Sequence, residues 1–200
     1  MKILLFGKTG QVAKELCNRP NVTAIGRDKA DFTEPQKIIE IVKSTDADII
    51  INAVAYTSVD LAEEEFELAN IINGTTVKEL AKVSASRNIP FLHISTDYVF
   101  KGDGNLNWKT SDQTNPQNSY GKSKLIGESG ILEAGGPHVI LRTSWVFSSH
   151  GNNFVKTMLR LASNNTELSI VKDQIGDQHA QKTLQTHFGK LHLISMQEME

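Results

Sequence analysis

Short apolar runs alternate along the chain with segments of helical periodicity. The apolar runs hold few polar residues, which is typical of strands buried on both faces; they cover residues 3–6, 22–25, 47–54, 89–95 and 139–147. The helical segments cover residues 11–18, 35–44, 61–86, 120–133 and 153–163. Because strands alternate with helices, the pattern predicts an α/β fold with a Rossmann-like, doubly wound parallel sheet.

Local signals set the limits of these elements. Thr33-Glu34-Pro35-Gln36 has the spacing of a capping box with proline in the first turn, and it predicts a helix that runs to about Ser44. Asn73-Gly74 allows an interruption of the long helical segment. Gly135-Gly136-Pro137 ends the helix that precedes it. Residues 101–119 are rich in Gly, Asn, Asp and Pro and predict a loop.

The composition excludes several classes of protein. With 200 residues, 39% hydrophobic and 22% charged, the chain is long enough for one domain, with or without a fragment of another, and is not disordered throughout. A net charge of −2 does not favour nucleic acid as a partner. The apolar runs are too short for a signal peptide or a membrane span, so we expect a cytoplasmic protein without a membrane partner. The single cysteine, Cys17, forms no intramolecular disulfide and is expected as a small apolar residue of the first helix.

A glycine turn follows the first strand. Gly7 and Gly10 are spaced G-x-x-G, and Ala13 stands where a third glycine could fall. Glycines between a strand and a helix let the backbone approach a pyrophosphate, and the helix start offers free N–H groups. A tight turn without a ligand remains the alternative at this point.

The end of the second strand bears on which dinucleotide would bind. Arg27 stands where an arginine can receive the 2′-phosphate of NADP, whereas Asp28, one residue later, keeps NAD open. A solvated surface arginine is the alternative interpretation. Asp31 and Phe32 follow, and we expect them to flank the adenine.

Tyr120 and Lys124 form a Y-x-x-x-K pair on a predicted helix. Residues four apart share one helix face, and a lysine ammonium close to a phenol lowers the phenol's pKa. Such a tyrosine can give a proton to a carbonyl oxygen while hydride arrives at the carbon. The pair is common by chance, but Thr96 ends the apolar run over 89–95 and should lie at the carboxyl edge of the sheet, where it could hold the substrate oxygen. The combination favours catalysis.

These features together resemble the extended short-chain dehydrogenase/reductases. The resemblance covers about residues 1–176, and its motifs lie at 4–12, 51–60, 95–100, 120–124, 142–147 and 151–154. It implies reduction, with NADPH or NADH, of the 4-keto group of dTDP-4-dehydro-6-deoxymannose to dTDP-rhamnose, a precursor of cell-surface polysaccharide such as the O antigen of lipopolysaccharide. It also implies a dTDP-sugar as partner and allows a homodimer and Mg²⁺, although the sequence identifies no metal site.

The resemblance also implies roles for individual residues. The catalytic residues are Thr96, Tyr120 and Lys124, with Tyr120 as proton donor. Cofactor contacts fall on the glycine turn, the adenosine end, the segment after the third strand and the catalytic pair: Gly7, Gly10, Gln11, Val12, Arg27, Asp31, Phe32, Ala55, Tyr56, Thr57, Tyr120 and Lys124. Substrate contacts fall on Thr96, Asp97, Tyr98 and Trp145. Tyr56 replaces a frequent histidine and Ala13 a glycine, at positions where the contacts are largely from the backbone.

The family pattern ends after residue 176. We therefore divide the chain into a dinucleotide-binding domain with the catalytic residues, 1–176, and a divergent tail, 177–200, with most of the family's C-terminal substrate lobe missing. A change of reading frame near Gly176 is our hypothesis for this loss. The alternative to an enzyme is a catalytically silent NADP-binding module or partner subunit. Glu63-Glu64-Glu65 is expected to be an exposed helix face and not a metal site.

Overall fold

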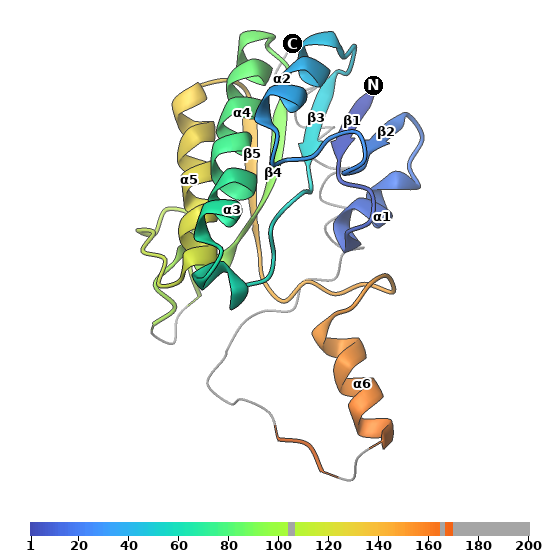
Figure 1. Ribbon diagram of the computed structural model, residues 1–200, viewed down its shortest axis with the longest axis vertical. Coiled ribbons are helices and arrows are strands. Elements are labelled where there is room, and N and C mark those ends of the chain that lie inside the picture. Colours follow the sequence, from blue (N-terminus) through green and yellow to red (C-terminus); the bar gives the residue numbers. More distant parts are fainter. Residues whose placement is uncertain (104–106, 165–166, 170–200) are drawn as a thin grey trace.

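A parallel sheet forms the centre of the molecule. The computed structural model describes residues 1–103, 107–164 and 167–169. The strands pair in the order β2-β1-β3-β4-β5 and every pair is parallel (Figure 1); they are β1 (Ile3–Phe6), β2 (Val22–Ile25), β3 (Ile49–Asn52), β4 (Phe91–Thr96) and β5 (His138–Thr143). The helices are α1 (Gln11–Cys17), α2 (Pro35–Ser44), α3 (Phe66–Asn70), α4 (Thr76–Ser86), α5 (Ser119–Ala134) and α6 (Phe154–Asn164).

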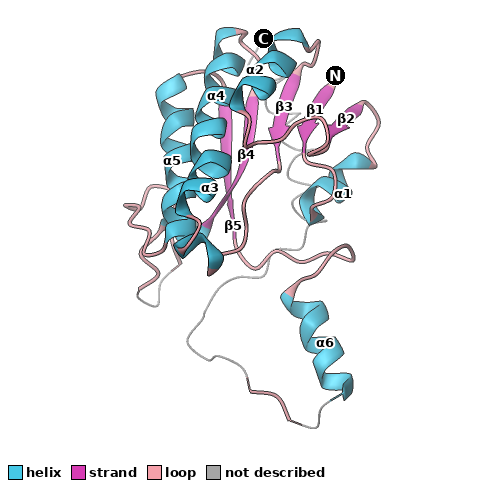
Figure 2. Ribbon diagram, in the orientation of Figure 1, coloured by secondary structure: helices cyan, strands magenta, loops and turns pink. Residues whose placement is uncertain are grey.

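Two apolar layers cover the sheet, because successive strand residues point to opposite faces. Leu4, Phe6 and Ile50 lie on one face of the sheet and pack against α2, α4 and α5, which Figure 2 shows side by side. Leu5 and Ile51 pack on the other face with the residues of α1. The predicted α/β fold with a doubly wound parallel sheet is therefore confirmed.

Most element limits follow the sequence pattern, with three differences. The third strand covers only Ile49–Asn52 of the run predicted over 47–54. The last strand stops at Thr143, earlier than the apolar run that continues to residue 147. The predicted capping box is wrong: Glu34 is the N-cap residue of α2 and makes no side-chain cap, while Thr33 bonds to Asp31. The short loop before α2 uses Thr33 for its own turn, and Pro35 still opens the helix.

The helical segment 61–86 is broken where Asn73-Gly74 allows it. A single π-helical turn, Ile71–Thr75, joins α3 to α4. The turn brings its backbone close to α5: a Cβ on Gly127 would lie 2.2 Å from the carbonyl oxygen of Asn73. π-turns inside helices are frequent at functional sites, and this one presents Asn73 to the segment after β3.

The last described helix, α6, stands apart from the sheet and its covering helices (Figure 1). It is amphipathic as predicted, with Phe154, Met158 and Leu161 at helical spacing, yet none of its residues is buried. Among the described residues, no helix is long and apolar enough to cross a membrane. The predicted tail, 177–200, lies outside the described residues.

Candidate active site

The predicted site residues come together at one edge of the sheet. Parallel strands end on the same side, so Gly7 after β1, Arg27 after β2 and the Thr96 end of β4 all lie there. The strand order reverses between β1 and β3, and ligands of open α/β sheets bind outside the carboxyl ends at such a point.

Gly7 occupies a turn that only glycine fits well. Its φ is +110°, and a Cβ there would lie 3.3 Å from the carbonyl carbon and oxygen of Ala53, which follows β3. Gly10, the N-cap of α1, has open space instead, since a Cβ there would meet nothing within 4 Å. The backbone is therefore tightly packed at Gly7 and has free space beside it at Gly10. Free space next to the start of a helix suits the binding of a pyrophosphate.

Arg27 is exposed at the end of β2 and bonds to Asp31. Its Nε donates to Oδ2 of Asp31 at 3.0 Å, while Oδ1 accepts from the N–H and the hydroxyl of Thr33 at 2.9 and 2.8 Å. The Thr33 N–H, with smaller help from Arg27, holds the pKa of Asp31 below its usual value. A charged carboxylate therefore fixes this turn and orients the guanidinium.

The ring of Phe32 does not lie at the site. It is 2% exposed and packs edge-on against Phe6, with ring centroids 5.6 Å apart. Its carbonyl oxygen accepts a hydrogen bond from the Thr76 hydroxyl at 2.7 Å. The ring is held in the core because an apolar ring gains more from burial than from exposure. For the predicted contact of Asp31 and Phe32 with the adenine, which stays a prediction, Phe32 has only its backbone available.

Thr96 and Tyr120 meet at the carboxyl end of β4. Thr96 is 5% exposed, and Tyr120 lies in the first turn of α5 with the Tyr98 ring edge-on to its own at 5.7 Å. Burial raises the pKa of Tyr120 to about 12, although a hydrogen bond with Thr96 acts in the opposite direction. The phenol therefore keeps its proton at neutral pH, as a proton donor requires.

Lys124 has other partners than the phenol. Its Nζ donates to the Ile94 carbonyl at 2.7 Å and lies 3.1 Å from Nε2 of His93. The side chain is 1% exposed, and this burial lowers the pKa of Lys124 to about 7, while Glu128 acts to raise it. The expected lowering of the Tyr120 pKa by a lysine ammonium is thus not what the structure shows.

Asn52 and His93 extend this polar line through the interior. Both are fully buried; Nδ2 of Asn52 lies 3.1 Å from Nδ1 of His93, and Oδ1 accepts from the Val54 N–H at 2.9 Å. Burial, with the help of Lys124, holds the pKa of His93 well below its usual value. Neither residue is predicted from the sequence, because a lone Asn and a lone His at strand positions have no motif spacing.

An ion pair between the buried Glu128 and the partly buried Arg142 anchors α5 beside the site. Glu128 lies one turn beyond Lys124, and its carboxylate accepts from Nε and Nη2 of Arg142 at 3.0 and 2.7 Å and from the Ser95 hydroxyl at 2.5 Å. The guanidinium also lies over the Phe100 ring, 4.8 Å from its centroid. These contacts join α5 to β4 and β5 and so hold the catalytic face of the helix in place.

Glu63 fixes the first residue of α5. Its carboxylate accepts from the N–H and the hydroxyl of Ser119 at 2.7 and 2.8 Å, directly before Tyr120. The bond to the Ser119 N–H holds the pKa of Glu63 below its usual value. Glu63 is exposed as expected, but it caps another helix, a role that local sequence did not reveal.

The segment after β3, which contains Ala55, Tyr56 and Thr57, is tied to α5. Asn73 receives the N–H of Tyr56 at 2.9 Å and donates to its carbonyl at 3.0 Å and to the Ser123 hydroxyl at 3.0 Å. The Tyr56 hydroxyl donates to Glu65. The predicted cofactor segment is therefore held at a fixed place beside the Tyr120 helix.

Gln11 and Trp145 border the segment that leads to α6. The Gln11 side chain accepts from Nδ2 of Asn153 at 3.0 Å and donates to the Asn152 carbonyl at 3.3 Å. Its contact with a pyrophosphate stays a prediction, for which the backbone is available. Trp145 has φ +44°, rare for a bulky residue, and its ring packs edge-on against Phe154 at 4.9 Å. Strain of this kind occurs at ligand sites.

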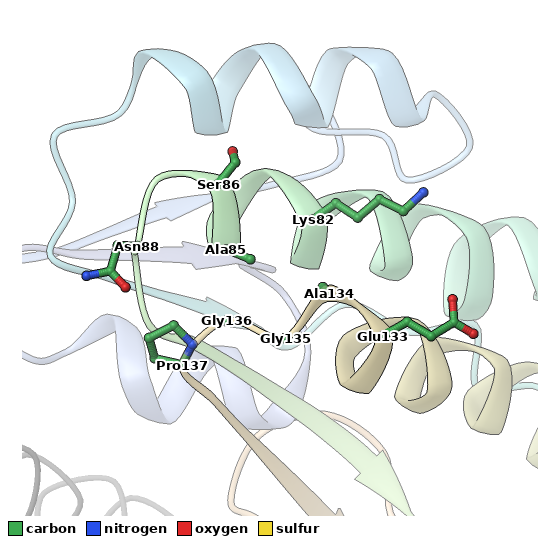
Figure 3. A pocket seen from close by; sticks show the side chains of 9 residues that line it. All are labelled: Lys82, Ala85, Ser86, Asn88, Glu133, Ala134, Gly135, Gly136 and Pro137. Carbon is green, nitrogen blue, oxygen red and sulfur yellow. The ribbon is translucent and has the colours of Figure 1, made fainter.

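A hollow at the other end of the molecule lies away from these residues. It has a volume of about 520 Å³ and is lined by the last turns of α4 and α5 and by Pro137, just before β5 (Figure 3). It therefore lies at the amino edge of the sheet, opposite the site. Within the described part of the chain, no group of three or more His, Cys, Asp and Glu side chains could hold a metal ion, so the Mg²⁺ that the resemblance allows has no candidate site there.

The fold and the residues at its edge define a Rossmann-like α/β protein of the dinucleotide-binding type. A family model, RmlD substrate binding domain, matches residues 1–191. The chain belongs to this family. The match runs past residue 176, so the boundary we set there stays a prediction.

Named relatives agree with the family. The chain is 47% identical over 184 residues to dTDP-4-dehydrorhamnose reductase of Escherichia coli K12, covering 88% of this chain and 62% of the relative. Spore coat polysaccharide biosynthesis protein SpsK of Bacillus subtilis is 38% identical over 180 residues, covering 88% of this chain and 64% of SpsK. The crystal structure of dTDP-4-dehydrorhamnose reductase from Bacillus anthracis, in complex with NADP, has a TM-score of 0.90 at 36% identity, covering 96% of this chain and 70% of that one. The chain thus spans about 62% of the length of the first of these curated relatives.

Proposed function

We propose that this chain carries the cofactor site and the catalytic residues of an NADPH-dependent dTDP-4-dehydrorhamnose reductase. The observation that carries the proposal is the hydrogen bond between the Tyr120 phenol and Thr96, at the sheet edge where ligands of this fold bind. The similarity to dTDP-4-dehydrorhamnose reductases supports a dTDP-4-dehydro sugar as substrate, and the NADP complex of the Bacillus anthracis reductase supports the cofactor class.

The residues present fit a dinucleotide. Gly7 leaves no room for a side chain beside Ala53, Gly10 leaves open space, and Arg27 offers a cation at the end of β2 where a 2′-phosphate would lie. The bound cofactor would supply hydride to the carbonyl carbon. NADPH is the preferred form in this proposal because Arg27 is exposed and charged; NADH stays the alternative.

The chain's own residues would then complete the reduction. Tyr120 gives its phenolic proton to the carbonyl oxygen, so the C=O group gains one hydride and one proton and becomes a secondary alcohol. Thr96 holds that oxygen beside the phenol. Asp97, Tyr98 and Trp145 border the space on the substrate side, and Tyr98 is 41% exposed.

The test is product formation by the purified chain. With NADPH and dTDP-4-dehydrorhamnose, the proposal expects a product two hydrogens heavier that co-elutes with dTDP-rhamnose. A folded chain that binds NADPH but forms no product would contradict it. That result would favour the second candidate, a catalytically silent NADP-binding module or partner subunit. A homodimer, a cytoplasmic location and a role in O-antigen synthesis remain predictions.

A further inference from the structure

The interior contains a line of three polar side chains, of which two, Asn52 and His93, have no part in the reduction step as proposed. Asn52 on β3, His93 on β4 and Lys124 on α5 are joined by contacts of 3.1 Å each and are all buried. A buried polar line of this kind is costly unless each donor meets an acceptor. The positions of the hydrogens therefore follow from the partners.

The orientation of the Asn52 amide is fixed by the backbone. Oδ1 accepts from the Val54 N–H at 2.9 Å, so Nδ2 is the atom that faces His93. An amide Nδ2 can only donate, and Nδ1 of His93 must therefore be an unprotonated acceptor. Burial keeps the imidazole neutral, since the pKa of His93 lies well below its usual value. The single ring proton is then on Nε2.

This tautomer decides what the lysine can be. The Nε2–H of His93 points at Nζ of Lys124, and an ammonium has no lone pair to receive it. A neutral amine does, and it still has an N–H for the Ile94 carbonyl at 2.7 Å. The geometry points to Asn52 and His93 as positioning residues that hold the Lys124 amine uncharged in the free protein, with Asn52 setting the tautomer and His93 donating to Nζ.

The charged groups around Lys124 agree with this assignment. Glu128, one turn along α5, favours the charged lysine, but Arg142 and Ser95 already occupy its carboxylate. Tyr120, one turn before, is a neutral phenol. Burial outweighs Glu128 and brings the pKa of Lys124 to about 7. The consequence for the reaction rests on the proposed function. An uncharged Lys124 does not draw the proton from Tyr120, so the phenol stays protonated for the reduction, and the amine can take up a proton near neutral pH.

Nuclear magnetic resonance of the ¹⁵N- and ¹³C-labelled chain, without ligand, tests the assignment independently of activity. Long-range proton–nitrogen correlations give the His93 tautomer, with His138→Gln, at an exposed position, to aid the assignment. We expect a proton on Nε2 and none on Nδ1, and a Lys124 side chain that titrates near 7. A proton on Nδ1, or a lysine that stays charged up to its ordinary pKa of about 10.4, would overturn the inference.

Two variants separate positioning from simple packing. Asn52→Asp has the same shape but can only accept, so it should move the ring proton to Nδ1 and raise the Lys124 titration by about one pH unit or more. His93→Gln keeps an N–H donor and should leave that titration low. The same Lys124 titration in Asn52→Asp and in the wild type would contradict the inference. If a variant does not fold, the His93 tautomer of the wild type still tests the inference.

Turnover adds a pH profile that tests the link to catalysis. If the wild type reduces the sugar, the pH at which its rate changes should move upward in Asn52→Asp by the same amount as the Lys124 titration. Rates that do not follow that titration would contradict the link to Tyr120. Absence of turnover in the wild type would instead contradict the proposed function, while the resonance data still decide the charge of Lys124.

Discussion

At the residue scale, Tyr120 and Lys124 illustrate what spacing predicts and what it omits. Four residues apart on a helix, they share a face as expected. The hydrogen-bond partners of the two side chains come from β4, which lies some 30 residues earlier in the chain: Thr96 contacts the phenol and His93 contacts the amine. Helix periodicity contains no information on these partners, so the sequence predicted the pair but not its charge states.

Arg27 is the residue on which cofactor choice should depend. Its guanidinium is oriented by Asp31 and is exposed at the end of β2. Arg27→Ala removes the charge that would meet a 2′-phosphate. It should weaken the binding of NADPH by about tenfold or more relative to the binding of NADH, since a charge-assisted hydrogen bond contributes about 1.5–3 kcal/mol. Fluorescence titration measures both affinities, with Lys29→Ala as the control. An unchanged NADPH-to-NADH ratio would show that Arg27 is a solvated surface residue.

Glu63 should make the stability of the Tyr120 helix depend on pH. The Ser119 N–H holds the folded pKa of Glu63 below its ordinary 4.5. The ionised carboxylate therefore contributes its full stabilisation of the folded protein above that pH. The contribution is lost as the pH falls through the folded value. Melting temperatures of wild type and Glu63→Gln should therefore differ at neutral pH and converge in acid. Glu64→Gln, next in sequence, is the control and should show no such convergence; a constant Glu63→Gln difference at every pH contradicts the account.

At the element scale, the sequence predicted strands well and helix contacts poorly. Ile3–Phe6 became a strand with the expected limits, because burial on both faces leaves a clear pattern. Val22–Ile25 also has the expected limits, although it is an edge strand with no buried residue. The capping box at Thr33 failed because Asp31 competes for the same hydroxyl. The π-turn at Ile71–Thr75 needs the approach of α5, which no local signal describes beyond the Asn-Gly pair.

The approach of α5 to the π-turn depends on Gly127. A Cβ there would lie 2.2 Å from the Asn73 carbonyl oxygen, a backbone atom that cannot move aside alone. Gly127→Ala should therefore lower the free energy of unfolding by about 1–3 kcal/mol, despite alanine's better helix propensity. Urea denaturation measures this, with Ser129→Ala, at an exposed position of the same helix, expected within about 0.5 kcal/mol of wild type. A Gly127→Ala variant as stable as the wild type would mean that α5 moves away from the π-turn without loss of free energy of unfolding.

At the scale of the whole molecule, two regions differ in how completely they are packed. The sheet and the helices on its faces form a buried core, whereas α6 has no buried residue. The sequence predicted this helix but not its isolation, because periodicity identifies an apolar face and not what covers it. Gln11 at the start of α1 joins the segment before α6 to the sheet domain through Asn153, and Trp145 packs against Phe154 at the start of α6.

The apolar side chains exposed on α6 outside the Phe154, Met158 and Leu161 face should promote association of the chain. Leu159 is 68% exposed and lies one turn beyond Val155. Contiguous apolar surface favours contact between molecules, so Leu159→Lys should lower the apparent mass that light scattering records at high concentration. Leu132→Lys, at a 62% exposed leucine of α5, is the matched control. If both variants scatter like the wild type, the α6 face plays no part in association.

The central claim is that Tyr120 gives the proton in a reduction at the carboxyl edge of the sheet. Sugar-dependent NADPH oxidation by wild type and Tyr120→Phe, measured side by side with NADPH affinity as the control, tests it most directly. We predict that the phenylalanine variant binds NADPH as the wild type does but turns over at least about 100-fold more slowly, the usual loss when a general acid is removed. Equal rates of oxidation in the two proteins would contradict the claim.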